Sequence, residues 1–233
     1  LTERFRVIAF DLPGFGQADR PVAAYDSAFF VEQLKALLDT LQIGRAHLVG
    51  SSLGASVIVR FSDENLERID RAVLAAPGGF GRETHPVMRF PALPVVGDWL
   101  GRPTPANNAL TLRLAIHDRR KVTRELIEQT NQYARVRGSD LSFVRTLQTG
   151  VGLLGVRERD SFERLARRFA RPALVVWGRQ DRVFPTRQSE RAVTLLPLSE
   201  RLLIDHCGHY PHWEQPEVFA TAVDRFLSKG AQA

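Results

Sequence analysis

The sequence has a single cysteine, Cys207, among its 233 residues. No disulfide can form within one chain, so a fold stapled by disulfides is excluded, and Cys207 is expected to be a small packed residue rather than a nucleophile. Apolar runs are also short, and none reaches the roughly 18 residues that a membrane-spanning helix needs. We therefore expect a soluble protein in a reducing cytoplasm.

Negative charge is scarce in the middle of the chain. The formal net charge is +6, and residues 81–170 carry 16 Lys and Arg against 9 Asp and Glu. Nucleic-acid-binding proteins also gather positive charge, but they place it beside aromatic residues or in a reading motif, and neither pattern is present. We expect no nucleic-acid partner. Arg119, Arg120, Lys121 and Arg124 are expected to form a solvated helix face, with attraction of an acidic substrate as an alternative.

Strand and helix patterns alternate over the first 80 residues and again from residue 171 onward. Runs rich in β-branched and aromatic residues predict strands at 6–10, 46–50, 71–76, 173–178 and 201–205. Apolar residues at helical spacing predict helices at 27–41, 55–61, 187–196 and 217–227. This alternation predicts an α/β fold, in which a mostly parallel sheet is flanked by helices.

The alternation stops in the middle segment. A proline-rich apolar stretch runs from Pro86 to Pro105, and helical patterns follow at 110–116 and 123–136. The predicted organisation is a core formed by residues 1–80 and 171–233, with residues 81–170 inserted as a helical lid. The apolar run at 87–96 suits a hydrophobic substrate group or, equally, plain packing of the lid on the core.

Gly50-Ser51-Ser52-Leu53-Gly54 lies between a predicted strand and a predicted helix, the setting that the G-x-S-x-G nucleophile elbow requires. The flanking glycines allow the sharp turn that lifts Ser52 above the sheet, and the following helix N-terminus favours developing negative charge. The backbone N–H of Leu53 would then supply one oxyanion donor. A Gly/Ser turn without chemistry is the alternative.

A serine hydroxyl becomes a good nucleophile when a histidine takes its proton and a carboxylate orients that histidine. Asp181 follows the strand predicted at 173–178, and His209 follows the one predicted at 201–205. Both therefore lie at the carboxyl edge of a parallel sheet, where active sites gather. Either residue alone could be an ordinary loop residue, but together with Ser52 they predict a catalytic triad.

These segments together resemble the α/β-hydrolase family along nearly the whole chain. The resemblance rests on Asp11–Gly16, the Ser52 elbow, the loop from Trp177 to Asp181, Gly208-His209 and Trp213–Glu217. It implies a core sheet capped by a helical lid. It also implies two or three strands and a second oxyanion donor ahead of the segment that begins at Arg6, so we expect an N-terminally truncated chain. Loss of one oxyanion donor typically costs about 100 to 1,000-fold in turnover.

Three functions follow as hypotheses. The first is hydrolysis of a small to medium hydrophobic carboxylic ester through an acyl-Ser52 intermediate, with His209 as base and then acid and Asp181 orienting it. The second is a carbon–carbon hydrolase of the meta-cleavage-product type acting on a ketone, although Ser51 and Leu53 stand where that subfamily usually carries Asn and Met. The third is an inactive fragment or a non-catalytic binding protein. The oligomeric state is left open.

No cofactor or metal ion is expected. His206, His209 and His212 recur at three-residue spacing, but Gly208 and Pro211 oppose the helix that would gather them. No pair of carboxylates accompanies these histidines. The imidazole of His209 is therefore assigned to acid–base chemistry.

Overall fold

The computed structural model describes residues 1–89, 97, 102, 104–157 and 162–229. Its centre is a parallel four-stranded sheet in the order β1-β2-β5-β6. The strands are β1 (Ala46–Ser51), β2 (Ile69–Ala75), β5 (Ala173–Gly178) and β6 (Ser199–Ile204). Four of the five predicted strands are thus confirmed within about two residues at each end, and so is the α/β fold class.

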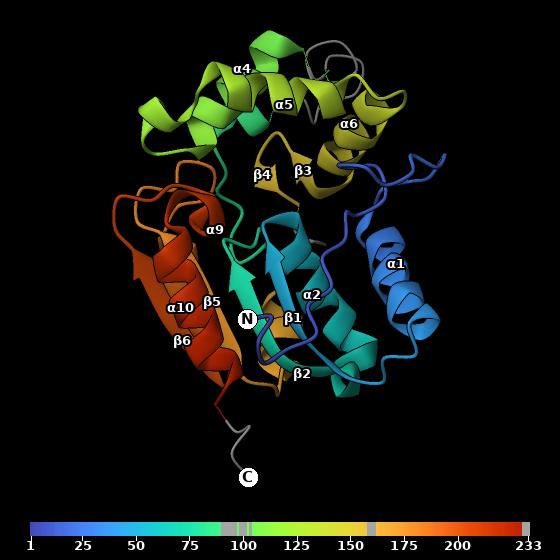
Figure 1. The fold of residues 1–233 in the computed structure, drawn as a ribbon, viewed down its shortest axis with the longest axis vertical. Helices are drawn as coiled ribbons and strands as arrows, with labels where there is room; N and C mark the ends of the chain where they lie inside the picture. Colours follow the sequence, from blue (N-terminus) through green and yellow to red (C-terminus); the bar gives the residue numbers. More distant parts are fainter. Residues whose placement is uncertain (90–96, 98–101, 103, 158–161, 230–233) are drawn as a thin grey trace.

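Helices cover both faces of this sheet (Figure 1). On one face lie α1 (Ser27–Thr40), α2 (Leu53–Asn65), α7 (Glu163–Arg168) and α8 (Arg187–Leu195), and on the other lies α10 (Pro216–Leu227). Successive side chains of a strand point to opposite faces, so Leu74 joins the apolar cluster of α1 and α2, whereas Val73 joins that of α10. Because both faces are covered, β5 is buried at every residue and reads as one continuous apolar run.

Helix α1 shows why a predicted helix begins where it does. The side chain of Asp26 accepts a hydrogen bond from the backbone N–H of Phe29 at 2.9 Å, which satisfies one of the free donors of the first turn. Phe30, Leu34 and Leu38 recur on one face of the helix and are buried against the sheet side. The helix predicted at 27–41 is confirmed.

Residues 6–10 do not form the predicted strand. They make no ladder in the part of the chain that the structure describes, and Val7, Ile8 and Phe10 are 52%, 40% and 45% exposed. The prediction rested on residue types alone. A strand also needs a neighbouring backbone that pairs with its N–H and C=O groups and a surface that buries its side chains, and this segment has neither among the described residues.

Between β2 and β5 the chain leaves the sheet and forms helices beyond the carboxyl ends of the strands (Figure 1). These elements are η2 (Pro86–Met88), α4 (Pro105–Ala115), η3 (Arg119–Lys121), α5 (Arg124–Ala134), α6 (Ser139–Gly150), and the short antiparallel pair β3 (Val151–Gly152) and β4 (Gly155–Val156). The helices predicted at 110–116 and 123–136 are confirmed as α4 and α5. Residues 90–96 of the apolar run at 87–96 lie outside the described residues. The division into core and lid stays a prediction.

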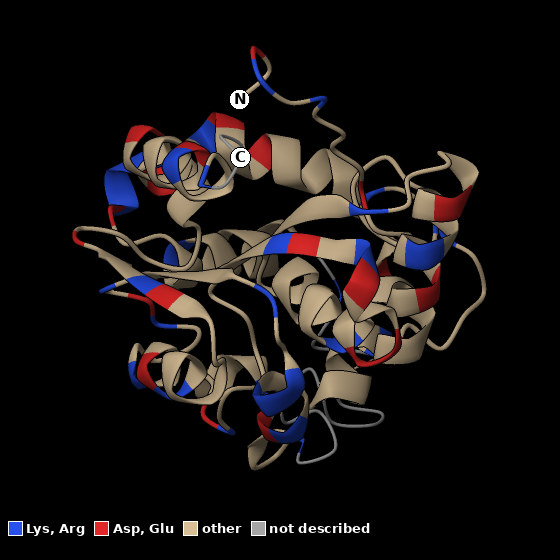
Figure 2. Ribbon diagram, turned by 90° about the horizontal axis from the view of Figure 1, so that it is seen from below, with Lys and Arg blue, Asp and Glu red and all other residues tan. Residues whose placement is uncertain are grey.

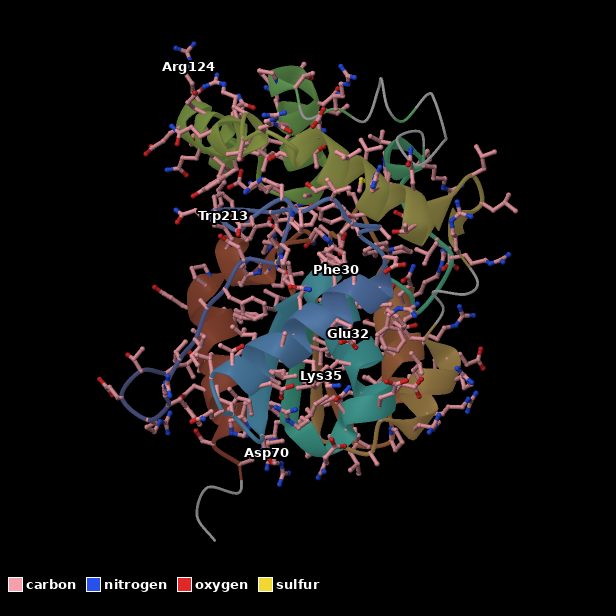
Figure 3. All side chains as sticks on the ribbon, turned by 90° about the vertical axis from the view of Figure 1, so that its right-hand side faces the viewer. Phe30, Glu32, Lys35, Asp70, Arg124 and Trp213 are labelled. Atoms are coloured by element: carbon pink, nitrogen blue, oxygen red, sulfur yellow. The ribbon has the colours of Figure 1, made fainter. Side chains whose placement is uncertain are left out.

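The charged residues agree with the expected solvated surface. Arg119, Arg120 and Lys121 are exposed on η3, and Arg124 projects away from the fold at the start of α5 (Figure 3). On the side of the molecule away from α4 and α5, acidic and basic residues are interspersed along the ribbon (Figure 2). No helix among the described residues is both long and apolar enough to cross a membrane.

Candidate active site

Ser52 lies at the turn between β1 and α2, where the backbone reverses sharply. Its φ is +50°, in the left-handed region that residues other than glycine rarely adopt, and its N–H donates to the carbonyl of Ala75 at 2.8 Å. A Cβ added at Gly50 would lie 2.5 Å from the carbonyl carbon of Gly54, so only glycine fits there. At Gly54 an added Cβ would meet nothing within 4 Å. Close packing therefore requires the first glycine of the pattern but not the second.

Asp181 is held in the loop after β5 by backbone donors. Its Oδ1 accepts hydrogen bonds from the N–H groups of Val183 at 2.7 Å and Phe184 at 3.0 Å. The indole N–H of Trp177 donates to the carbonyl of Phe184 at 3.1 Å and so ties this loop back to β5. The carboxylate is completely buried, and its second oxygen, Oδ2, faces His209.

The three side chains predicted as a triad meet at the carboxyl edge of the sheet. Nδ1 of His209 lies 2.8 Å from Oδ2 of Asp181, and Nε2 of His209 lies 2.9 Å from Oγ of Ser52. An ionised carboxylate can only accept, so the His209 proton belongs on Nδ1 and Nε2 is left to accept from the serine hydroxyl. This arrangement can pass a proton from Ser52 to His209.

The loops after β5 and β6 are joined to each other. The N–H of Gln180 donates to the carbonyl of Cys207 at 2.9 Å, and the side-chain oxygen of Gln180 accepts from the N–H of Cys207 at 3.0 Å. A Cβ at Gly178 would lie 2.0 Å from the carbonyl oxygen of Gly208, so the loops approach at a glycine. Cys207 is fully buried, and burial raises the pKa of its thiol to about 12. The thiol therefore stays protonated near neutral pH, as expected of a packed residue.

Leu53, the predicted oxyanion donor, is the first residue of α2. An N–H in the first turn of a helix has no acceptor within that helix, and the partial positive charge of the helix terminus lies at the same place. Leu53 also lines the cavity that opens beside Ser52. The position therefore suits the binding of a negatively charged oxygen.

That cavity has a volume of about 1350 Å³. It exceeds the roughly 300–1,000 Å³ of ordinary ligand sites because it continues from Ser52 and His209 along β1 to residues 5–12. Its wall is largely apolar and includes Met88, Phe143 and Leu147. Phe184 and Tyr210 also line it, and their rings lie against the ring of His209. The arginines on its wall are Arg6, Arg45 and Arg60, and the described part of residues 81–170 contributes no Lys or Arg to it.

The profile of the alpha/beta hydrolase fold matches residues 1–216, and the chain belongs to this family. It is therefore a hydrolase, and the resemblance inferred from its motifs is confirmed. A 2-hydroxy-6-oxononadienedioate/2-hydroxy-6-oxononatrienedioate hydrolase from Burkholderia vietnamiensis is 31% identical over 227 residues, which cover 97% of this chain and 77% of that protein.

Solved structures of other hydrolases share the fold. A meta-cleavage product hydrolase from Pseudomonas fluorescens superposes with a TM-score of 0.83 at 27% identity, covering 98% of this chain and 82% of that one. A thermophilic esterase from Thermogutta terrifontis superposes with a TM-score of 0.69 at 25% identity, covering 94% of this chain and 78% of that one. The chain is thus similar both to a meta-cleavage product hydrolase and to an esterase.

Sequence reasoning missed one group beside the site. Glu214 on α9 (Pro211–Glu214) is 1% exposed, and its carboxylate accepts the backbone N–H of Gly208, next to His209. In the sequence Glu214 was only part of the family resemblance. The one sequence feature that could have indicated its burial is the neighbouring Trp213. A Trp-Glu pair is equally compatible with an exposed helix, so this feature does not distinguish the two cases.

Proposed function

We propose that the protein cleaves a small to medium hydrophobic carboxylic ester through an acyl-Ser52 intermediate. The observation that carries the proposal is the continuous hydrogen-bonded series from Ser52 Oγ through His209 to Asp181. His209 Nε2 takes the hydroxyl proton as Ser52 Oγ attacks the ester carbonyl, and it then gives the proton to the leaving alcohol. A water molecule attacks the acyl-enzyme by the same proton transfer, and the carboxylic acid leaves with Ser52 restored.

Three further assignments belong to this proposal. The N–H of Leu53 binds the oxygen that becomes negative during attack, because the start of α2 offers a free donor at that place. Residues 81–170 act as the lid, since α4 and α6 contribute Ala115, Phe143 and Leu147 to the cavity wall. The small-molecule substrate is expected in the cytoplasm.

A carbon–carbon hydrolase of the meta-cleavage-product type is the second candidate, because two of the similar proteins carry such a name. The substrates in the Burkholderia vietnamiensis name are dioates, which carry two carboxylates. A site for them would be expected to place a cation on the cavity wall. The cations on the wall are Arg6, Arg45 and Arg60, and the described part of residues 81–170 adds none, so a dioate would have to be held from outside the expected lid.

The test is turnover of a short-chain p-nitrophenyl ester series and of a 2-hydroxy-6-oxo-dienoate by the wild type and by Ser52→Ala. Ester turnover is expected in the wild type, with a loss of roughly 10,000-fold or more in Ser52→Ala. Ser228→Ala, at the end of α10, removes a hydroxyl with no hydrogen-bond partner among the described residues and is the matched control.

Turnover of the dienoate alone would establish the second candidate instead. If the wild type turns over neither substrate and a fluorophosphonate does not label Ser52, both of these hydrolase candidates fail and a non-catalytic binding protein is favoured. Labelling of Ser52 without turnover would show an activated serine whose substrate lies outside both series.

A further inference from the structure

Glu214 is a buried carboxylate whose described partners are backbone N–H groups. Oε1 accepts from Gly208 at 2.9 Å and from Tyr210 at 3.4 Å, the two residues that flank His209. Oε2 accepts from the N–H of His117 at 2.7 Å. One oxygen therefore binds the loop that carries His209, and the other binds the turn that leaves α4.

The end of α4 and the η3 segment after it contact the His209 loop and α9 in further ways. The carbonyl of Ala115 accepts the N–H of His209 at 2.7 Å, and Lys121 Nζ donates to the carbonyl of Glu214. A Cβ at Gly208 would lie 2.2 Å from the carbonyl oxygen of Ala115, so the two segments meet backbone to backbone. The exit of α4 and the histidine loop are thus bound to each other rather than merely adjacent.

A carboxylate in this place is costly to bury. Burial raises the pKa of Glu214 above its ordinary value, and the hydrogen bonds from His117, Tyr210 and Gly208 oppose that rise. Plain packing would be served as well by an apolar side chain of similar size, without the desolvation penalty. What only a carboxylate offers is two oxygens that accept several N–H groups at once, and hydrogen bonds to an ionised acceptor are roughly twice as strong as neutral ones.

We propose that Glu214 is a positioning residue that holds the His209 loop and the exit of α4 in one arrangement, so that the catalytic histidine and the helices above the cavity keep a fixed relation. The inference rests on the proposed role of His209. Glu214 does not line the cavity and contacts neither Ser52 nor Asp181 in the described hydrogen bonds, so it acts through His209.

Glu214→Gln is the informative variant because it keeps the size and shape of the side chain but leaves only one of its two accepting oxygens. One oxygen becomes an NH₂ donor, so in either amide orientation a backbone N–H of the His209 loop or of His117 faces another donor. Glu217→Gln makes the same chemical change at an exposed position in the first turn of α10 and is the matched control.

We expect kcat for the best p-nitrophenyl ester to fall on the order of 10 to 100-fold in Glu214→Gln, since a small displacement of a catalytic group costs this much. KM should change by less than about twofold, because no substrate contact is removed. The fluorophosphonate labelling rate should fall in parallel, and the NMR signal of the His209 Nδ1–H should broaden or shift. Glu217→Gln should match the wild type in all four measurements.

A wild-type kcat and labelling rate in folded Glu214→Gln would overturn the proposal, and so would a loss that only follows the unfolded fraction measured by circular dichroism. If Glu214→Gln does not fold, Glu214→Asp takes its place: it keeps the charge but withdraws the oxygens from one partner, and the same loss of kcat is expected. Labelling of Ser52→Ala at the wild-type rate would instead refute the proposed function, so the two failures appear in different variants.

Discussion

The carboxyl end of β1 and its open edge differ sharply in how many contacts hold the neighbouring chain in place. At its carboxyl end, Ser52, His209 and Asp181 are hydrogen-bonded in series, and the loops behind them are bonded to each other. Along its open edge, Val49 is half-exposed, and the large cavity continues to residues 5–12, which form no strand ladder with the described residues. The arrangement of the three catalytic side chains can therefore be set by a few short loops that follow strands. The open edge of β1, close by in the same fold, remains loosely packed.

The largest expected effect is at the tightly held side. In Asp181→Asn the Oδ1 atom can still accept from Val183 and Phe184, but an NH₂ group then faces His209 and favours the wrong tautomer. Ester turnover should fall roughly 10,000-fold with little change in thermal stability. Asp205→Asn, at an exposed loop position, should retain wild-type turnover. A loss of less than about tenfold in Asp181→Asn would show that Asp181 does not orient His209.

A second, smaller contrast lies within the nucleophile elbow itself. Gly50→Ala places a Cβ against the backbone at the start of α2, so we expect a loss of about 1–3 kcal/mol in the free energy of unfolding and a displaced Ser52. Gly54→Ala meets nothing and should be neutral or stabilising by up to about 1 kcal/mol. Urea denaturation of both variants measures the two changes in the free energy of unfolding. Equal destabilisation would contradict the close packing of Gly50 against the backbone of Gly54.

The last comparison makes one chemical change in the two regions, and its smallest expected effect is at Val49. Val175→Ala in β5 removes completely buried methyl groups and should cost about 2 kcal/mol or more. Val49→Ala in β1 acts on a half-exposed side chain and should cost less than about 1 kcal/mol. Similar losses in both variants, measured by denaturation, would mean that the edge of β1 is as well packed in solution as the centre of the sheet.

The site was predictable because each of its three residues lies in the loop that follows a strand. Ser52, Asp181 and His209 each stand just after a recognisable apolar run, and parallel strands bring their carboxyl ends to one edge. The distances among their side chains follow from that placement. The catalytic roles themselves stay predictions until turnover is measured.

Three failures of sequence reasoning have physical causes. Residues 6–10 have the composition of a strand, but pairing depends on a neighbour that composition does not reveal. Helix α6 was missed because it is buried partly through small polar side chains, and Ser142 donates to the carbonyl of Gly14 rather than packing an apolar stripe. Glu214 was missed for a related reason, since its partners are backbone groups far away in the sequence.

The reactivity of Cys207 can report on how often the His209 loop opens. Because it is the single thiol of the chain, is fully buried and has a pKa raised to about 12, a disulfide reagent in neutral solution should be consumed only while the His209 loop is open. The rate at which the reagent releases one chromophore per protein molecule would then measure the opening of this loop in the unmodified protein. Ligands that hold the loop shut would slow the release in proportion to the fraction of the protein left unliganded.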